Sequence, residues 1–335
     1  MNPVLVEVTR GNQVESAHRG AAVITDPAGA VVFAAGDVER RVYSRSAVKA
    51  LLALPLVETG AADRLGLSEA EIAFACSSHN GEDFHVAAAL SMLTKAGRDG
   101  GVLECGIQWP GYDPAAHALV RADAKPSALH NNCSGKHSGF ICLACDRGED
   151  PAGYVKPEHP TMRQITAALA DMTSTTLDSR NYAVDGCSIP TYAIPLRALA
   201  HAFARFGSGV GLPAARARAT ARIRAAVAAH PEMVAGTGRF DTKLIGELGA
   251  RVFVKSGAEG VFCGAIPELG LGIAIKCEDG AGRAAQVAMA ALVQRFLPSN
   301  GQPTPVLAAL ARPTVTNWNG IHVGDICPAA ALLAN

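Results

Sequence analysis

Short apolar and alternating segments lie at the start of the chain. Residues 3–9, 16–25 and 29–35 are apolar or alternate between apolar and polar positions, and Gly-Asn and Asp-Pro-Ala-Gly sequences separate them. A period of two indicates strands that bury one face, and turns of this composition favour antiparallel pairing. These segments therefore predict an antiparallel meander.

A second series of short apolar segments begins near residue 250. Residues 251–255, 261–266 and 271–277 are separated by the turn sequences Gly-Ala-Glu-Gly and Pro-Glu-Leu-Gly. This arrangement predicts a series of antiparallel hairpins. Residues 282–296 have the pattern of an amphipathic helix. We expect the proline-rich stretch 298–306 to be a surface loop.

Helical patterns fill the region between these two series. Residues 46–56 are rich in helix-forming residues, and Pro55 marks an expected end or kink. Ser68 followed by Glu71 predicts a helix start with a capping box. Further helices are expected at 84–96, 137–147, 160–172, 191–205 and 212–229.

The order of these elements predicts a mixed α/β fold of the α+β type. Its antiparallel sheet would be built from both chain ends, about residues 1–45 and 250–335, with a largely helical region at about 46–249 inserted between them. We find no internal repeat in the sequence. The simplest assignment is a single domain spanning residues 1–335.

Composition narrows the function classes. The formal net charge is zero, with 30 Lys and Arg against 30 Asp and Glu, which removes the electrostatic basis for a nucleic-acid or anionic-membrane partner. The sequence shows no membrane-spanning stretch, and its start lacks the pattern of a secretory signal. Nine cysteines are an odd number, so we expect reduced thiols in the cytoplasm and no disulfide framework. The pair Cys142 and Cys145 continues an apolar segment and is expected to be core.

Ser46 and Lys49 form an S-x-x-K motif at the start of a predicted helix, where both side chains lie on one face. Lys255-Ser256-Gly257 follows a predicted strand, and an early S-x-x-K with a late K-S/T-G is the layout of serine β-lactamases and penicillin-binding proteins. A serine needs a base to become a nucleophile, and Lys49 can serve only as a neutral amine. Burial and the second cation would lower the pKa of Lys49. The alternative is an ordinary helix-start serine with a surface lysine.

The sequence HNNCSGKH at 130–137 is the densest group of polar side chains, and DGCSIP at 185–190 forms a second polar turn. Cys133 and Cys187, helped by His130, His137 or Asp185, could hold a zinc ion. The alternative for the first segment is a helix cap, in which Ser134 and Gly135 begin a helix and the asparagines satisfy the loop backbone.

Several longer stretches of the sequence carry a specific resemblance to a known family. In chain order these stretches are SSHNGE at 77–82, HNNCSGKHSGF at 130–140, DGCSIPTYAIPL at 185–196, GRFDTKL at 238–244 and KSGAEGVF at 255–262. Together they closely resemble the L-asparaginase II family of the Rhizobium type. That family resembles serine β-lactamases and glutaminases in fold, which agrees with the order of strands and helices given above.

The resemblance implies roles for individual residues. Ser46 matches the family's nucleophile and Lys49 the lysine of its S-x-x-K motif. Ser78 and Lys255 match a second serine–lysine pairing. The implied zinc ligands are Cys133, Lys136 and Cys187, and the residues expected to contact substrate or its oxyanion are Arg45, His79, Asn80, His137, Asp185 and Ala258. Ser188 departs from the glycine that we expect in many relatives, which affects only the geometry of that turn.

These observations favour a cytoplasmic L-asparaginase that converts L-asparagine and water to L-aspartate and ammonia. We expect the chain to form a homodimer, with zinc as cofactor. One alternative is a glutaminase or another S-x-x-K serine amidohydrolase. Another is a zinc hydrolase in which metal-bound water attacks. The non-enzymatic alternative is a zinc-dependent amino-acid binding protein without turnover.

Overall fold

A computed structural model of the chain describes residues 1–297 and 303–333. Its internal contacts divide the chain into two compact units, and neither unit is continuous in sequence. The first unit comprises Met1–Ala47, Ala193–Val210 and Gly246–Asn335, and the second comprises Val48–Tyr192 and Gly211–Ile245. The assignment of residues 1–335 to a single domain stays a prediction.

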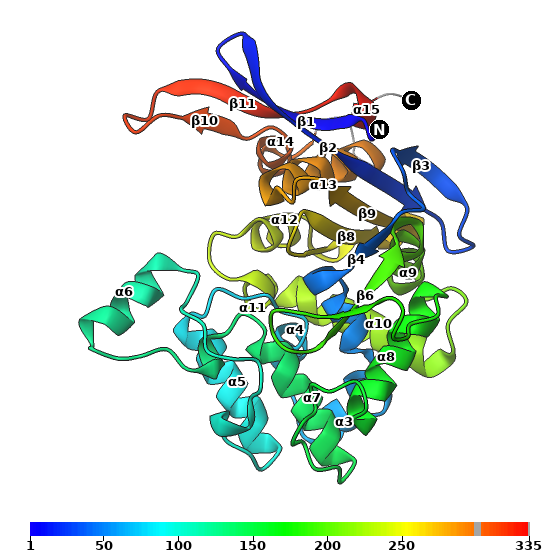
Figure 1. Ribbon diagram of the computed structural model, residues 1–335, viewed down its shortest axis with the longest axis vertical. Helices are drawn as coiled ribbons and strands as arrows, with labels where there is room; N and C mark the ends of the chain where they lie inside the picture. The colour runs from blue at the N-terminus through cyan, green and yellow to red at the C-terminus, as the bar shows by residue number, and fades with distance from the viewer. Residues whose placement is uncertain (298–302, 334–335) are drawn as a thin grey trace. The chain divides into compact units, whose positions relative to one another are not determined.

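The first unit contains an eight-stranded antiparallel sheet (Figure 1). Its strands run in the order β10-β11-β1-β2-β9-β8-β7, and β3 pairs with β2 outside this path. The strands are β1 (Val4–Arg10), β2 (Gln13–Thr25), β3 (Val31–Ala35), β7 (Phe253–Ser256), β8 (Val261–Ile266), β9 (Leu271–Cys277), β10 (Thr314–Thr316) and β11 (His322–Pro328). The pairing of β1 with both β2 and β11 joins the two chain ends. This confirms the predicted fold class: both ends form one antiparallel sheet.

Helices α9 (Leu196–Ser208) and α13 (Gly282–Phe296) pack against the strands of this sheet. Every residue of β8 is buried, which explains its continuously apolar sequence. At Gly272 on β9, an added Cβ would lie 2.0 Å from the carbonyl oxygen of Ala200 in α9. Only glycine lets the helix and strand backbones approach this closely. Phe253 of β7 packs against Phe203 and Phe206 of α9 and extends the same core.

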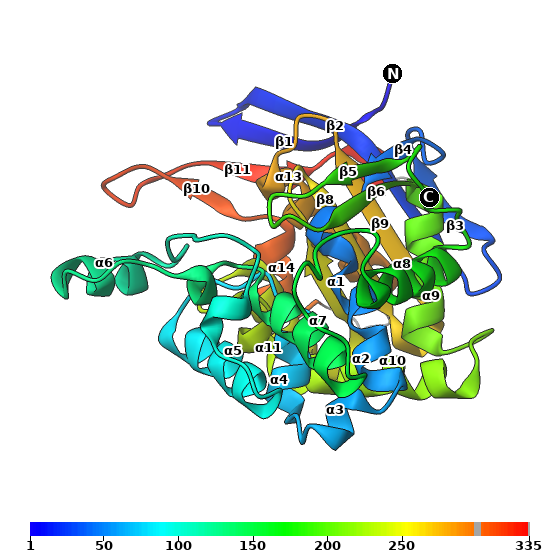
Figure 2. The same ribbon diagram turned by 60° about the horizontal axis from the view of Figure 1, so that its bottom comes forward.

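The second unit is largely helical, as the sequence predicts (Figure 2). Its central helix α7 (Ser134–Asp146) is buried from Ser134 to Ala144 and contacts most of the neighbouring helices. Helix α4 begins with the predicted capping box of Ser68 and Glu71. The other helices are α1 (Lys49–Leu52), α2 (Leu54–Glu58), α3 (Ala61–Arg64), α4 (Glu69–Phe74), α5 (Asp83–Lys95), α6 (Asp113–Arg121), α8 (Pro160–Thr173), α10 (Ala214–Ala229) and α11 (Pro231–Ala235), with α12 (Phe240–Leu248) crossing into the first unit.

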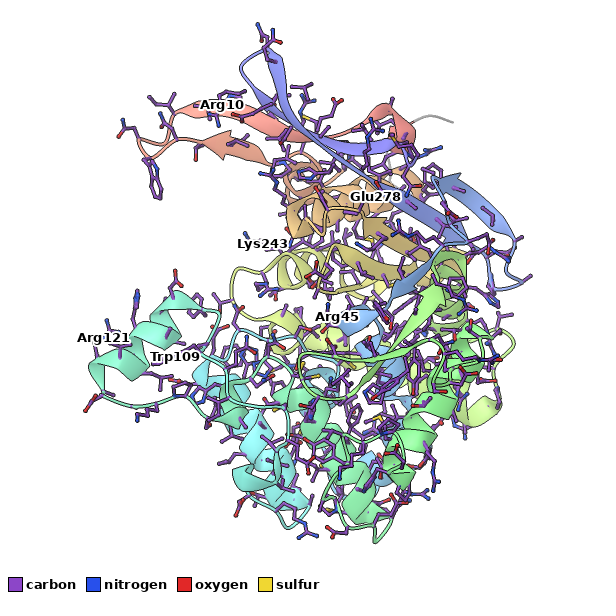
Figure 3. The ribbon with its side chains drawn as sticks, viewed as in Figure 1. Arg10, Arg45, Trp109, Arg121, Lys243 and Glu278 are labelled. Carbon is purple, nitrogen blue, oxygen red and sulfur yellow. The ribbon has the colours of Figure 1, made fainter. Side chains whose placement is uncertain are left out.

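Helix α6 lies on an exposed excursion of the chain between α5 and α7. None of its residues is buried, and the apolar side chains of Ile107, Trp109 and Val120 are exposed on this segment. Figure 3 labels Trp109 and Arg121, which lie on this segment. No helix was expected here from the sequence pattern.

Three local predictions differ from the structure. The helix expected at 191–205 begins only at Leu196, because Pro190–Pro195 form strand β6, which pairs with β5 (Tyr182–Val184) and β4 (Arg41–Tyr43). The interruption expected at Pro55 lies two residues earlier, at Ala53 between α1 and α2, and Pro55 itself lies in the first turn of α2, where its missing N–H costs nothing. Of the expected loop at 298–306, residues 298–302 lie outside the described part of the chain, and Pro305 already begins α14 (Pro305–Ala311).

Within residues 1–297 and 303–333, no helix combines the length and hydrophobicity that crossing a membrane requires.

Candidate active site and thiol–lysine cluster

The predicted nucleophile Ser46 lies in the short 3-10 helix η1 (Arg45–Val48), directly after β4. Its neighbour Arg45 adopts a left-handed backbone conformation with φ of 47°. A residue other than glycine in this conformation carries a conformational cost that the surrounding structure must offset. Ser46 itself is half-buried. Lys49, three residues later, begins α1.

The turn after β7 lies beside the start of η1 in the first unit. A Cβ added to Gly257 would lie 3.0 Å from the backbone nitrogen of Ala47. The N–H of Gly257 donates to the carbonyl of Val261 at 2.8 Å, which closes the turn around the exposed Ala258. Lys255 is fully buried on β7, and its Nζ donates to the carbonyl of Ser256 at 2.7 Å. The structure therefore brings the Lys-Ser-Gly turn next to the segment that carries Ser46.

Lys49 is the most enclosed amine of the second unit, with 1% of its surface exposed. Its Nζ lies 2.5 Å from the carbonyl oxygen of Ser77, 2.9 Å from Oγ of Ser78 and 3.1 Å from Sγ of Cys133. The N–H of Ser78 donates to the carbonyl of Val234 at 2.8 Å and fixes that residue beside the lysine. In the resemblance Ser78 belongs with Lys255, whereas here its hydroxyl contacts Lys49.

Burial lowers the pKa of Lys49, and the charge of Lys136 lowers it further, although the sulfur of Cys133 opposes both. The three contacts suit either protonation state. As an ammonium, Lys49 donates to all three acceptors. As a neutral amine, it donates to Ser77 and Cys133 and accepts a hydrogen bond from the hydroxyl of Ser78. Lys49 can therefore gain or lose a proton without leaving a buried polar group unpaired.

Cys133 and Lys136 lie at the start of α7, and Cys187 lies in the turn between β5 and β6. Cys133 is the N-cap residue of α7, and Lys136 follows one turn later, so both face the same side. Nζ of Lys136 lies 3.0 Å from Sγ of Cys187. The turn that carries Cys187 contains Ser188 at φ of 75°, the conformation for which glycine is expected in relatives. The structure thus brings together the three residues implied as zinc ligands.

The surroundings shift the pKa values of the Cys133 and Cys187 sulfurs in opposite directions. The hydrogen bond from Cys187 is the largest cause that lowers the pKa of Cys133 well below its ordinary value, and the charges of Lys136 and Lys49 add to it. The same hydrogen bond, together with burial, raises the pKa of Cys187. Burial lowers the pKa of Lys136, but the two sulfurs outweigh burial and raise its pKa above the usual lysine value.

The donor atoms of this thiol–lysine cluster (Lys49, Cys133, Lys136 and Cys187) fit a zinc ion, because zinc prefers sulfur and nitrogen ligands. Lys136 would have to lose its proton, which the charge of a bound metal favours. In the part of the chain that the structure describes, no three His, Cys, Asp or Glu side chains gather as a metal-binding group. A zinc ion here would therefore need the amine of Lys136 beside the two sulfurs.

The predicted substrate residues His79 and Asn80 hold their own loop in place. The N–H of Gly81 donates to Nδ1 of His79 at 3.0 Å, so Nε2 carries the ring proton and donates to Oγ of Ser134 at 2.9 Å. Burial lowers the pKa of His79 well below its ordinary value, which keeps the ring neutral. The amide of Asn80 donates to the carbonyl of Thr237 at 3.2 Å and accepts from Arg239 at 3.1 Å.

His137 is buried on α7, and its Nδ1 lies 2.7 Å from the hydroxyl of Tyr154. That hydroxyl also accepts a hydrogen bond from the N–H of Glu104 at 2.9 Å. Its own proton then goes to Nδ1, which places the ring proton on Nε2. Among the described residues Nε2 has no hydrogen-bond partner, which leaves a buried donor for a ligand. The predicted residue Asp185 lies in the Cys187 turn, where its carboxylate accepts from the N–H of Gly186 at 2.8 Å.

The residues that support His137 and the loop of His79 and Asn80 were not predicted from the sequence. Tyr154 is fully buried and positions His137, yet it lies in a polar segment without any motif. Thr237 donates to Glu82 from both its backbone N–H and its hydroxyl, at 2.8 and 2.6 Å. The signal that could have found this clamp is the glycine-flanked sequence Gly-Thr-Gly-Arg at 236–239.

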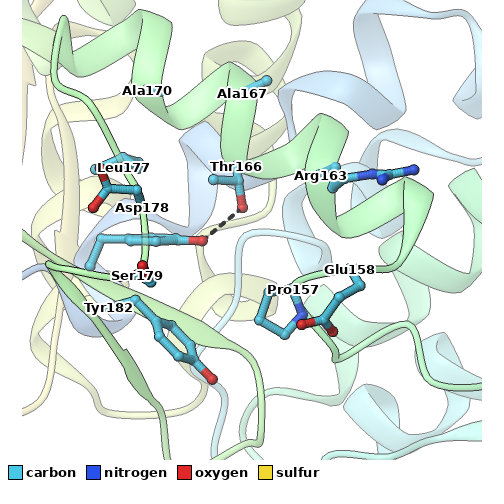
Figure 4. A pocket seen from close by; sticks show the side chains of 11 residues that line it. Pro157, Glu158, Arg163, Thr166, Ala167, Ala170, Leu177, Asp178, Ser179 and Tyr182 are labelled. Carbon is cyan, nitrogen blue, oxygen red and sulfur yellow. Dashed lines mark hydrogen bonds between the residues drawn. The ribbon is translucent and has the colours of Figure 1, made fainter.

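A cavity of about 440 Å³ lies elsewhere in the second unit, between α8 and the β5–β6 hairpin. Figure 4 shows side chains that line it, and among them Oγ1 of Thr166 lies 3.3 Å from the hydroxyl of Tyr192. None of the predicted site residues lines this cavity. It is therefore separate from the candidate active site.

The profile of the L-asparaginase II family matches residues 6–328, nearly the whole chain. Among solved structures, a β-lactamase from Mycobacterium bovis aligns with 79% of this chain and 89% of its own, at 16% identity and a TM-score of 0.38. A structure of Mglu aligns with 91% of this chain and 74% of its own, at 17% identity and a TM-score of 0.38. No curated protein sequence matches the chain. The family match confirms the resemblance: the chain belongs to the L-asparaginase II family, whose members are amidohydrolases of the asparaginase type.

Proposed function

We propose that this protein is an L-asparaginase that uses a serine nucleophile and a lysine base. The observation that carries the proposal is the buried amine of Lys49, which contacts the hydroxyl of Ser78 and the sulfur of Cys133 and whose pKa is lowered by burial. A lysine acts as a base only when it is held neutral, and burial is the usual means. We also expect the protein to be a homodimer and to be located in the cytoplasm.

In this mechanism Ser46 attacks the side-chain amide carbon of L-asparagine after giving its proton to Lys49. The backbone N–H groups of Ser46 and Ala258 stabilise the oxyanion of the tetrahedral intermediate. The close approach of Gly257 to Ala47 supports this pairing, because it places the two backbone segments side by side. Ammonia leaves with a proton from Lys49, and water then hydrolyses the aspartyl ester.

Zinc belongs to the proposal as an organising cofactor. Cys133, Lys136 and Cys187 would hold it, and its charge would fix the two sulfurs and orient the polar groups of the pocket. The residues of the chain carry the reaction itself: Ser46 forms the ester, Lys49 moves the proton, and His137 offers its unpaired Nε2–H to the substrate.

Release of ammonia tests the function directly. We expect the purified chain to release ammonia from L-asparagine faster than from L-glutamine, measured by a coupled assay with and without a chelator. Faster release from L-glutamine would instead favour a glutaminase. Binding of L-asparagine in calorimetry without any ammonia would favour the binding protein and contradict an enzyme.

The zinc site predicts a metal content that depends on Cys133. We expect one zinc ion per chain in elemental analysis of the wild-type protein, and none in the Cys133→Ala variant, because two of three protein ligands cannot hold zinc tightly. Cys142→Ala is the matched control: its sulfur donates to the carbonyl of Met92, outside the thiol–lysine cluster, so zinc content should not change. An unchanged content in Cys133→Ala would mean that other ligands hold the metal.

A further inference from the structure

The cavity of about 440 Å³ between helix α8 and the hairpin of β5 and β6 has the size of a ligand site. Pockets that bind small molecules usually measure about 300 to 1,000 Å³. None of the residues assigned to the hydrolytic mechanism or to the zinc site lines it. The two strands of the hairpin flank the turn that carries Asp185 and Cys187. The proposed function leaves this cavity without a role.

One face of α8 forms a wall of the cavity. The residues of this wall, in order along the helix, are Arg163, Thr166, Ala167 and Ala170. Their spacing of three and four positions places them on one side of a helix. The two alanines have the smallest side chains that a helix favours. They leave space where larger side chains would close the gap between α8 and the hairpin.

Two tyrosines on the hairpin form another wall. Tyr182 on β5 and Tyr192 on β6 are direct partners in the strand register, so both rings lie on one face of the hairpin. Their ring centroids are 6.2 Å apart. The hydroxyl of Tyr192 lies 3.3 Å from Oγ1 of Thr166, which is long for a hydrogen bond between two hydroxyls. Aromatic rings beside a cavity favour a ligand that carries an aromatic ring of its own.

Two oppositely charged residues border the same cavity, Glu158 before α8 and Arg163 in its first turn. Among the described residues, neither charged group has an ion-pair or hydrogen-bond partner. Asp178 also lines the cavity, but its carboxylate accepts from Arg180 at 2.6 Å. Figure 4 shows Glu158 and Arg163 on the other side of the view from Tyr182. Both side chains are long and exposed, so their charged ends can turn towards a ligand at the opening.

We propose that this cavity binds a free amino acid with an aromatic side chain. The ring of the ligand packs against Tyr182 and Tyr192. Its carboxylate accepts hydrogen bonds from the guanidinium of Arg163, and its ammonium group donates to the carboxylate of Glu158. The aromatic and the charged residues of the cavity thus match the two ends of the ligand. A molecule that carries only one of the two charges leaves the other charged residue unpaired.

Calorimetric titration of the full-length protein with L-phenylalanine tests the proposal. We expect saturable binding. Phenethylamine lacks the carboxylate and 3-phenylpropanoate lacks the ammonium group, so each loses one charge-assisted hydrogen bond. We expect each of them to bind about tenfold more weakly than L-phenylalanine.

Variants of the lining residues locate the ligand. Arg163→Gln should weaken L-phenylalanine binding about tenfold and leave phenethylamine binding unchanged. Glu158→Gln should weaken L-phenylalanine binding but not that of 3-phenylpropanoate. Ala170→Leu keeps a good helix former, fills part of the cavity and should abolish binding. Arg121→Gln is the matched control, because it removes the same charge from an exposed position of α6 and should change nothing.

Three outcomes would overturn the proposal. The first is that L-phenylalanine shows no saturable binding. The second is an affinity that Arg163→Gln and Ala170→Leu both leave unchanged, because the ligand would then lie elsewhere, for example in the candidate active site. The third is equal affinity for L-phenylalanine and phenethylamine, which would mean that the carboxylate makes no contact. The titration uses no asparagine and alters no residue of the hydrolytic mechanism, so its result is independent of the proposed function.

Discussion

Replacing Ser46 with alanine is expected to lower kcat for L-asparagine by about 10⁴-fold or more while the protein stays folded. The reason is that the chain would lose its nucleophile without a substitute hydroxyl at the start of η1. Ser46 is half-buried, so removal of its hydroxyl leaves the core unchanged. Steady-state ammonia release measures the effect, and circular dichroism checks the fold. Ser16→Ala, on β2, is the matched control and should keep full activity.

Two results would contradict the role of Ser46. Activity of Ser46→Ala within tenfold of wild type would remove it from the mechanism. The second is a loss of activity confined to Ser78→Ala. That outcome would assign the nucleophile to the hydroxyl that the structure places 2.9 Å from Nζ of Lys49.

Replacing Lys49 with arginine is expected to abolish turnover, with a loss in kcat/KM of several orders of magnitude. A guanidinium keeps its proton throughout the accessible pH range and so cannot serve as a base. It is also planar and larger than an amine, in a site that leaves only 1% of Lys49 exposed. Lys243→Arg, at an exposed position of α12, changes the same side chain outside the site and should be neutral.

The pH dependence of kcat/KM for the wild-type protein tests the same role of Lys49 as a base. Lys49 works as a neutral amine, so kcat/KM should rise with pH through its pKa and fall as the solution becomes acidic. Because burial lowers that pKa, the rise should come below the range of an ordinary lysine. A profile that is flat between about pH 5.5 and pH 9 would contradict a lysine base and favour a carboxylate, which ionises near pH 4.

Strands with a strong local signal could be predicted from the sequence. Strand β8 is apolar throughout because both of its faces are covered, and α13 matches the expected range 282–296. Strand β6 could not be predicted, since its strand character depends on pairing with β4, a short strand that is far away in sequence, and with the three-residue strand β5. Local propensity contains no information about such partners.

In the candidate site, too, some features could be predicted from the sequence and others could not. Local patterns identified Lys49, Cys133 and Cys187, because amines and thiols stand out in an apolar sequence, whereas Lys136 was implied as a ligand only by the family resemblance. Motifs did not show that Lys49 touches Cys133, a contact between residues 84 positions apart. Tyr154 went unnoticed for a related reason: a tyrosine is as common in cores as in sites, and only its hydrogen bonds to His137 and Glu104 reveal its role.

The pairing of β1 with β11 has a consequence for biosynthesis. Thr9 and Asp325 exchange hydrogen bonds across 316 positions of sequence. A ribosome that adds 5 to 20 residues per second needs on the order of 20 to 60 s to make the second partner after the first. Throughout that time the nascent meander offers an uncovered strand edge, to which other chains can pair. Expression at reduced temperature or with chaperones that shield early strands should therefore improve the yield of native protein.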